Sequence, residues 1–419
     1  MKVLVVGGGG REHTIIWKLA QSPMKPELFA APGNAGIAKL ATCVDIKATD
    51  VAGVVQFAKE NQIDLTVVAP DDPLMLGMVD SLEQAGLKAF GPRQNAAIIE
   101  GSKVFSKDLM KKYGIPTAAY EVFDDSEKAI SYLQTVSYPT VVKAEGLALG
   151  KGVIIAQNFE EAKAAVEDIM CDKVFGDAGS RVVIEEFLTG HEVSVLAFTD
   201  GKTLYPMVSA QDHKRAYDND EGPNTGGMGT FSPSRLYTKA IHEECMSKIF
   251  MPTMAAMNKE GRTFKGVLYF GLIMTENGVK VIEYNARFGD PETQVVLPRL
   301  KTDLLEIFLA VAEERLADID VVWDDGAAVC VVLASGGYPK QYAKGLPIHG
   351  IEDAESDPAI TVFHAGTAMK DGVYVTAGGR VLGVTAVGDD LEAAIKKAYE
   401  GAAKVCFDKV HYRKDIGRK

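Results

Sequence analysis

Cysteine is scarce and scattered in this sequence. Its five cysteines include no Cys-x-x-Cys pair, and its seven histidines show no metal-ligand spacing. Small disulfide scaffolds and structural zinc sites depend on such spacings, so both classes are excluded. Isolated thiols are typical of a reducing compartment, and we therefore predict a cytoplasmic protein.

Positive charge and long apolar runs are also lacking. The 45 lysines and arginines are outnumbered by 57 acidic residues, which gives a formal charge of -12. Sequence-independent nucleic-acid binding requires a basic face, so we predict no nucleic-acid partner and assign the local basic clusters to small anions. At the N-terminus, Lys2 is followed by four apolar residues before Gly7. This run is too short for a signal peptide or a membrane anchor, and we expect no membrane partner.

The sequence has the composition of a folded protein of several domains. Charged residues make up 24% and hydrophobic residues 47% of its 419 residues, enough for about three domains of ordinary size. Strands alternating with helices predict an α/β fold that begins with a parallel sheet over residues 1–102. We place a second domain at 103–324, with a small subdomain at about 118–190, and a C-terminal α+β domain at 325–419.

The stretch from Val279 to Gln294 reads as a strand that carries charged side chains. Because side chains alternate between the faces of a strand, the pattern assigns one face to Val281, Glu283, Asn285 and Arg287 and an apolar face to Ile282, Tyr284, Ala286 and Phe288. Oxygen ligands at Glu283 and Asn285 suit a hard divalent cation such as Mg²⁺, which is commonly shared with substrate phosphates. Arg287 could grip a phosphate or carboxylate. An ordinary half-solvated strand is the alternative.

The residues after this strand favour the site. Gly289 and Asp290 end the strand, and Pro291 is placed to open a helix that begins with acids. Ligands of α/β sheets bind where strands end.

Two glycine-rich loops near the N-terminus predict an anion site. Gly7 to Gly10 connect a buried strand to a helix, and the loop from Pro32 to Gly36, which contains Asn34, follows the next strand. The dinucleotide fingerprint is incomplete, because Glu12 stands at its third glycine and the second strand does not end in an acid. A phosphorylated small molecule is therefore favoured over NAD, and a plain tight turn is the alternative for either loop alone. Asp71 lies in the loop that follows another expected strand of this domain, at 65–69.

Two features of the middle domain suit a nucleotide. Lys143 precedes a loop in which Gly150, Lys151 and Gly152 could cover phosphates, although a flexible hairpin is possible and the P-loop pattern is absent. A strand that ends in Glu185, Glu186, Phe187 and Leu188, followed by Glu192, could hold an adenine edge and a ribose. Farther along the chain, the segment 211–215 is followed by a long irregular stretch at 218–233 that contains Gly226 and Gly227. Together they favour a basic substrate loop.

Ten short motifs in order resemble the glycinamide ribonucleotide synthetase family of ATP-grasp enzymes over the whole chain. They are GGREH (9–13), APGNAG (31–36), EGSK (100–103), GKGV (150–153), VIEEFL (183–188), QDHKR (211–215), GPNTGGMG (222–229), NARFGDPETQ (285–294), GGRVL (378–382) and RKDIG (413–417). The resemblance implies ATP-dependent joining of glycine to 5-phosphoribosylamine through glycyl phosphate. It also implies Mg²⁺ or Mn²⁺, small-molecule substrates, and a monomer or homodimer.

The resemblance assigns roles residue by residue. It implies metal ligation by Glu283 and Asn285, and catalytic roles for Arg287, Lys214 and Asp212. It places ATP at Lys103, Lys143, Gly150, Lys151, Gly152, Glu185, Glu186, Phe187, Leu188 and Glu192. It assigns substrate binding to Gly9, Gly10, Asn34, Asp71, Gly226, Gly227 and Asp290.

Two other functions deserve comparison. A carboxylase of the same superfamily would make carboxyphosphate from bicarbonate, and would release ADP without glycine. A nucleotide-binding module without catalysis would not need Glu283, Asn285 and Arg287 together, so their presence argues against it.

Overall fold

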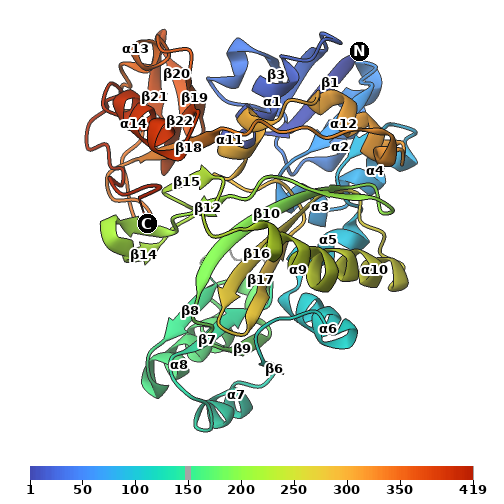
Figure 1. Ribbon diagram of the computed structural model, residues 1–419, viewed down its shortest axis with the longest axis vertical. Coiled ribbons are helices and arrows are strands. Elements are labelled where there is room, and N and C mark those ends of the chain that lie inside the picture. Colours follow the sequence, from blue (N-terminus) through green and yellow to red (C-terminus); the bar gives the residue numbers. More distant parts are fainter. Residues whose placement is uncertain (147–151, 419) are drawn as a thin grey trace.

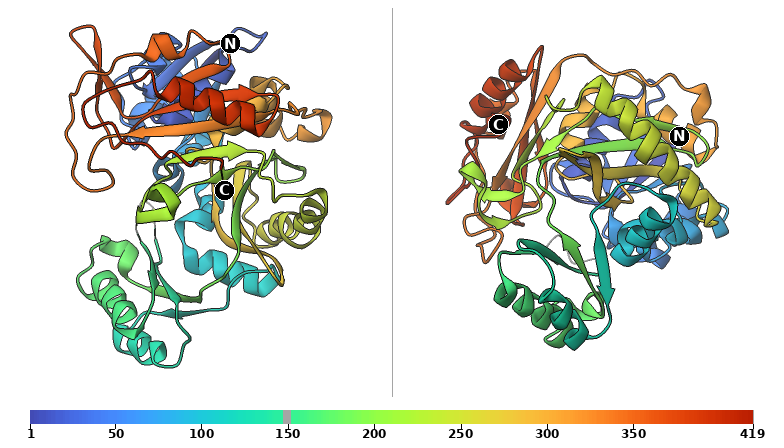
Figure 2. Two further views of the ribbon diagram at one scale, coloured as in Figure 1. Left: turned by 60° about the vertical axis from the view of Figure 1, so that its left-hand side comes forward. Right: turned by 60° about the horizontal axis from the view of Figure 1, so that its bottom comes forward.

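The computed structural model describes residues 1–146 and 152–418. The N-terminal and C-terminal parts lie beside each other at one end of the molecule, and the subdomain that contains α7 (Ser126–Leu133) and α8 (Phe159–Val166) lies at the other (Figure 1). The two views of Figure 2 show a central sheet between these ends. The predicted α/β class of fold is confirmed.

The N-terminal sheet is parallel, with strand order β3-β2-β1-β4-β5. Its strands are β1 (Lys2–Gly7), β2 (Glu27–Pro32), β3 (Thr42–Cys43), β4 (Leu65–Val68) and β5 (Ala89–Phe90), and its helices are α1 (Gly10–Leu19), α2 (Val51–Glu60), α3 (Asp71–Met75), α4 (Met78–Gln84) and α5 (Gln94–Gly101). The apolar run in β1 is buried on both faces, as expected of a central parallel strand. Parallel strands end at one edge, so the loops after β1, β2 and β4 meet there.

A small subdomain follows α6 (Lys103–Tyr113). Its sheet has the order β6-β9-β7-β8. The elements are β6 (Tyr120–Phe123), α7 (Ser126–Leu133), β7 (Thr140–Ala144), β8 (Val153–Ala156), α8 (Phe159–Val166) and β9 (Val182–Glu186). Val142 and Ile184 pack with both helices in a separate apolar core. The subdomain therefore has a core of its own.

The central sheet is antiparallel, with the order β11-β10-β16-β17. It consists of β10 (His191–Thr199), β11 (Leu204–Pro206), β16 (Gly266–Thr275) and β17 (Gly278–Asn285), next to α9 (Lys239–Cys245) and α10 (Met251–Lys259). A β-bulge interrupts β17, because Gly271 pairs with Glu283 while the next residue, Leu272, pairs with Val281. Ile282 is the extra residue, and the bulge changes which side chains share a face.

The C-terminal sheet combines distant parts of the chain. Its order is β12-β15-β18-β22-β19, built from β12 (Gln211–Asp212), β15 (Gly229–Ser232), β18 (Ala327–Ala334), β22 (Arg380–Gly388) and β19 (Ile360–His364). The stretch 218–233, expected to be irregular, in fact contains β15 and β14 (Glu221–Asn224), which pairs with β13 (Arg215–Tyr217). That expectation was wrong, because short polar strands that pair with distant partners show no apolar alternation.

Several helices and a small two-stranded sheet, β20-β21, lie outside these sheets. They are α11 (Thr293–Val296), α12 (Leu304–Ala312), α13 (Ile351–Ala354), β20 (Thr367–Lys370), β21 (Val373–Thr376) and α14 (Leu391–Ala402). Pro291 does not open a helix as predicted, because α11 begins two residues later at Thr293. Within the described residues, no helix is both long and apolar enough to span a membrane.

Candidate functional site

Glu283 and Asn285 lie on one face at the end of β17. They pair with Gly271 and Tyr269 of β16 in regular register, so the bulge leaves their relationship intact. The prediction that Val281 shares their face was wrong. Val281 is fully buried in the apolar core together with Tyr284, because the extra residue at the bulge reverses the alternation.

Cationic groups surround Glu283. Lys214 Nζ lies 3.9 Å from Glu283 Oε1 and 3.0 Å from Glu192 Oε2. Burial alone would raise the pKa of Glu283, but the charges of Lys214, Lys143, Lys103 and, more weakly, Arg287 together lower it. The Glu192 carboxylate is the main cause of a pKa well above the ordinary value at Lys214. Both groups therefore stay ionised, and the cationic side chains next to Glu283 could also contact an anionic ligand.

The donor set of Glu283 and Asn285 fits a divalent cation. A carboxylate and an amide oxygen are hard ligands, and two protein ligands suffice for Mg²⁺ when waters and phosphates complete its octahedron. Within 1–146 and 152–418 no cluster of three histidine, cysteine or acidic side chains could hold a metal ion. A metal bound here would thus need oxygen atoms from its ligand.

Lys103, Lys143 and Glu185 converge where the subdomain meets the central sheet. Lys143 Nζ lies 2.9 Å from Glu185 Oε2, and Lys103 Nζ donates to the Gly146 carbonyl. Glu185 is 4% exposed, and its second oxygen, Oε1, is buried without a partner among the described residues. A buried carboxylate oxygen without a donor is costly, which suits a ligand that supplies an N–H.

Sequence reasoning missed Lys107 in this cluster. It is 2% exposed, and its Nζ lies 2.9 Å from Glu185 Oε2 and 2.8 Å from Thr117 Oγ1. Burial lowers the pKa of Lys107 to about 8, although Glu185 opposes the shift. The available signal was helical spacing, since Lys107 follows Lys103 by four residues on α6 and so lies on the same face.

The predicted adenine segment spans the end of β9 and the loop after it. The side chain of Glu186 accepts from the backbone N–H of Ala119 at 3.0 Å and pairs with Lys280, while Phe187 is 39% exposed. Leu188 is half-buried. In the loop after Lys143, Gly152 accepts a backbone hydrogen bond from Ala144, whereas Gly150 and Lys151 lie outside the described residues.

The two N-terminal glycine loops touch each other. A Cβ on Gly8 would lie 2.3 Å from the Gly33 carbonyl oxygen, so both loops require bare backbone here. Gly9 and Gly10 open α1, and Gly9 N–H donates to Glu12 Oε2 at 2.6 Å. One amide of the predicted anion loop is therefore already used within the chain.

Asn34 is a structural bridge. Its amide nitrogen donates to the carbonyls of Gly8 and His364, each at 2.9 Å, and its oxygen accepts from the N–H groups of Gly36 and Ile37. Both ends of the amide are thus engaged by backbone. This favours a positioning role over the direct substrate contact that the sequence suggested.

Arg287 and Asp71 face each other between the two halves of the site. Arg287 Nη2 lies 2.7 Å from Glu100 Oε1 and 3.6 Å from Asp71 Oδ2, and its Nε is buried with no partner among the described residues. Burial raises the pKa of Glu100, although Arg287 opposes this. Glu100 was not predicted, because its place in the EGSK motif gives no indication of its distant partner.

Asp290 and the glycine pair at 226–227 meet Arg380, another residue that was not assigned. Arg380 Nη1 donates to the carbonyls of Gly226 and Asp290 at 2.6 and 2.8 Å. A Cβ on Gly227 would lie 2.5 Å from Pro291 Cδ and 2.7 Å from Asp212 Oδ1. The loop at 222–229 is therefore held closely against the end of β17.

Asp212 lies at the base of this arrangement. Its Oδ1 is buried with no partner among the described residues. Burial and the nearby Glu292 carboxylate raise its pKa well above the ordinary value. Asp212, Lys214, Glu192, Tyr269 and Glu283 line one narrow cleft. A cationic ligand next to Asp212 would offset the repulsion from Glu292.

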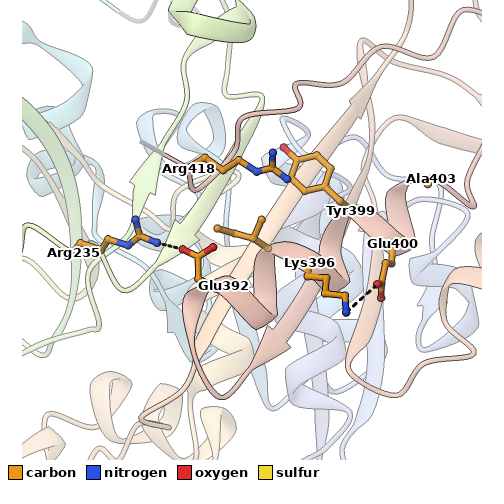
Figure 3. A pocket seen from close by; sticks show the side chains of 8 residues that line it. Arg235, Glu392, Lys396, Tyr399, Glu400, Ala403 and Arg418 are labelled. Atoms are coloured by element: carbon orange, nitrogen blue, oxygen red, sulfur yellow. Dashed lines mark hydrogen bonds and ion pairs between the residues drawn. The ribbon is translucent and has the colours of Figure 1, made fainter.

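A wider groove elsewhere contains none of the predicted site residues. It lies along α14, where Arg235 pairs with Glu392 and Lys396 with Glu400, beside Tyr399 (Figure 3). Two of the three cationic side chains that line the groove are thus paired with carboxylates, and the third, Arg418, lies over the ring of Tyr399.

Comparison with known proteins identifies the family. Residues 1–100 match the N domain of the phosphoribosylglycinamide synthetase family, 101–293 its ATP-grasp (A) domain and 328–419 its C domain. The chain belongs to the phosphoribosylglycinamide synthetase family. The resemblance inferred from the ten motifs is thereby confirmed.

Relatives of this synthetase family match the whole chain. A phosphoribosylamine–glycine ligase of Caldanaerobacter subterraneus subsp. tengcongensis is 50% identical over 99% of both chains. The trifunctional purine biosynthetic protein adenosine-3 of Gallus gallus is also 50% identical, over 99% of this chain and 42% of its own.

Solved structures agree with this assignment. The phosphoribosylamine–glycine ligase of Thermotoga maritima is 35% identical over 99% of this chain and 100% of its own, with a TM-score of 0.86. The biotin carboxylase domain of a Hydrogenobacter thermophilus 2-oxoglutarate carboxylase is 18% identical, with a TM-score of 0.76, over 98% of this chain and 91% of its own. That second likeness shows a shared fold alone.

Proposed function

We propose that this protein joins glycine to 5-phospho-D-ribosylamine at the expense of ATP. A glycine carboxylate oxygen attacks the γ-phosphorus, the bond to ADP breaks, and glycyl phosphate forms. The amine nitrogen then attacks the acyl carbon and phosphate leaves, giving glycinamide ribonucleotide. The observation that carries the proposal is the convergence of Lys103, Lys143, Lys214 and Arg287 around Glu283, which shares a face of β17 with Asn285.

The phosphate end of the nucleotide belongs beside these cations. Lys103, Lys143 and the loop that includes Gly150, Lys151 and Gly152 would neutralise its charge, and Glu283 with Asn285 would hold Mg²⁺ or Mn²⁺. The metal would supply Lewis-acid stabilisation to the transferring phosphoryl group. Arg287 is placed to bind the oxygens of that group, because positioning and charge account for most phosphoryl-transfer catalysis.

The nucleoside end belongs at the segment from Glu185 to Leu188. The free Glu185 Oε1 is an acceptor for an exocyclic amine, the exposed Phe187 offers apolar contact, and Glu192 can accept ribose hydroxyls. Glu186 is engaged by Ala119 and Lys280, which leaves its backbone as the ligand contact.

The acid and amine substrates belong on the other side of Arg287. The partnerless oxygen of Asp212 would accept the glycine ammonium, with Gly226 and Gly227 close to it. Gly9, Gly10, Asp71 and Asp290 would surround phosphoribosylamine, whose phosphate suits the start of α1. Lys214 stabilises the negative charge that develops between the two substrates.

The proposal also includes domain limits at 102 and 324 and a subdomain at about 118–190. It further includes a monomeric or homodimeric state and a cytoplasmic location. Scattered thiols support the location.

A substrate-omission assay tests the reaction. ADP release is measured with ATP and Mg²⁺ while glycine or phosphoribosylamine is left out in turn. We expect full turnover when both are present, with product detected by mass. Bicarbonate-stimulated ADP release in the absence of glycine would instead identify a carboxylase.

A further inference from the structure

The GGREH motif contains a buried histidine that the reaction does not use. His13 lies on α1, four residues after Gly9, and is 6% exposed. Its Nδ1 accepts a hydrogen bond of 2.7 Å from the backbone N–H of His364, at the end of β19 in the C-terminal sheet. The remaining proton therefore sits on Nε2. Burial, with the nearby His364 and Lys39, lowers the pKa of His13 to about 3, so the ring is neutral at physiological pH.

This hydrogen bond joins two domains next to the glycine loops. α1 contacts β19 in the fold. The residue after His364 continues the contact, since a Cβ on Gly10 would lie 3.6 Å from Ala365 Cβ. The turn at 364–366 thus rests on the first residue of the helix that would receive a phosphate.

Asn34 and Gly36 of the second glycine loop also contact His364. Asn34 Nδ2 donates to the His364 carbonyl as well as to Gly8. A Cβ on Gly36 would lie 2.4 Å from the imidazole Cγ of His364, so that ring packs directly on the loop backbone. The ring is also held by Thr367, whose Oγ1 lies 3.0 Å from His364 Nδ1.

We propose that His13 is a positioning residue that holds the C-terminal turn 364–366 against both glycine loops and so completes the phosphoribosylamine site. This inference rests on the proposed function. Without the Nδ1 acceptor, the His364 N–H is buried without a partner, and the turn loses the bond that fixes its distance from α1. The loops at Gly8 and Asn34 then lose a common support, whereas the nucleotide site on the central sheet keeps all its contacts.

His13→Leu tests the inference, because leucine fills a similar volume without an acceptor. We expect the KM for phosphoribosylamine to rise about tenfold, with kcat at saturating amine and calorimetric ATP affinity within about twofold of wild type. His13→Asn should restore much of the KM, since its amide oxygen can occupy the position of Nδ1. His242→Leu, on the remote helix α9, is the matched control and should leave every parameter unchanged.

Gly36→Ala changes the packing of His364 on the second glycine loop and leaves His13 unchanged. Gly36 has a φ of -78°, which alanine adopts readily, so the added methyl group acts mainly by displacing the His364 ring. The KM for phosphoribosylamine should rise here too, even if His13→Leu fails to fold.

The outcomes separate this inference from the proposed function. A wild-type protein that makes no glycinamide ribonucleotide would refute the function itself. With an active wild type, an unchanged amine KM in His13→Leu or Gly36→Ala would refute the positioning role alone. Equal losses for ATP and amine would show a general folding defect and refute it as well.

Discussion

Glu283→Gln removes the charge around which the nucleotide site is arranged. A divalent cation would have two protein ligands here, so the substitution weakens half of the protein's coordination and removes its anionic member. Loss of such a ligand costs several kcal/mol of transition-state stabilisation. A loss of about 3 kcal/mol corresponds to a fall in rate of about 150-fold. We expect kcat to fall by about that factor and the Mg²⁺ requirement to rise.

The fold should tolerate this change. At the observed 3.9 Å between Lys214 Nζ and Glu283 Oε1, the ion pair is worth about 4 kcal/mol at an effective dielectric constant of about 20. The two side chains are 40% and 38% exposed, so screening reduces this to about 1 kcal/mol or less. Lys214 also keeps its closer partner Glu192 at 3.0 Å. Thermal unfolding should therefore shift by only a few degrees.

The assay is ADP release during an Mg²⁺ titration, with calorimetric binding of ATP in the presence and absence of the metal. Glu276→Gln, at the exposed turn between β16 and β17, provides a matched control that should behave as wild type. Near wild-type turnover by Glu283→Gln at low Mg²⁺ would refute the assignment of this carboxylate to the metal.

Three further changes probe other parts of the site. Lys107→Met replaces a buried ammonium whose folded-state pKa of about 8 lies below the unfolded value of 10.5. Between these two pKa values the unfolded wild type binds more protons than the folded wild type. The free energy of unfolding of the wild type should therefore rise with pH, relative to that of the variant, by up to about 1.4 kcal/mol per pH unit. If denaturant curves show a constant difference between the two free energies of unfolding from pH 7 to 10, this reasoning is wrong. Arg287→Lys cannot hold Glu100 at 2.7 Å and a phosphate together, so kcat should fall about 100-fold in single-turnover measurements; a change under threefold would remove its catalytic role. Gly9→Val places a Cβ 2.8 Å from Glu12 Oε2 at the start of α1 and should raise the KM for phosphoribosylamine while calorimetric ATP affinity stays constant; equal losses would point to misfolding.

Features that depend on the local order of residues along the chain were predictable from the sequence. The alternation of strands and helices predicted a parallel N-terminal sheet, and the structure has this arrangement. Glu283 and Asn285 are two residues apart on one strand, and they share a face as expected. The ten motifs were sufficient for the family.

Contacts between distant residues, in contrast, depend on how the domains pack. The bulge at Ile282 places Val281 in the core, because an extra residue on one strand reverses the alternation and depends on the partner strand. No sequence pattern reveals that Glu100 pairs with Arg287. The same holds for the contact of Arg380 with Gly226 and for the pair of Lys107 with Glu185. Side-chain contacts of this kind arise when separate sheets pack, and periodicity within one segment carries no information about them.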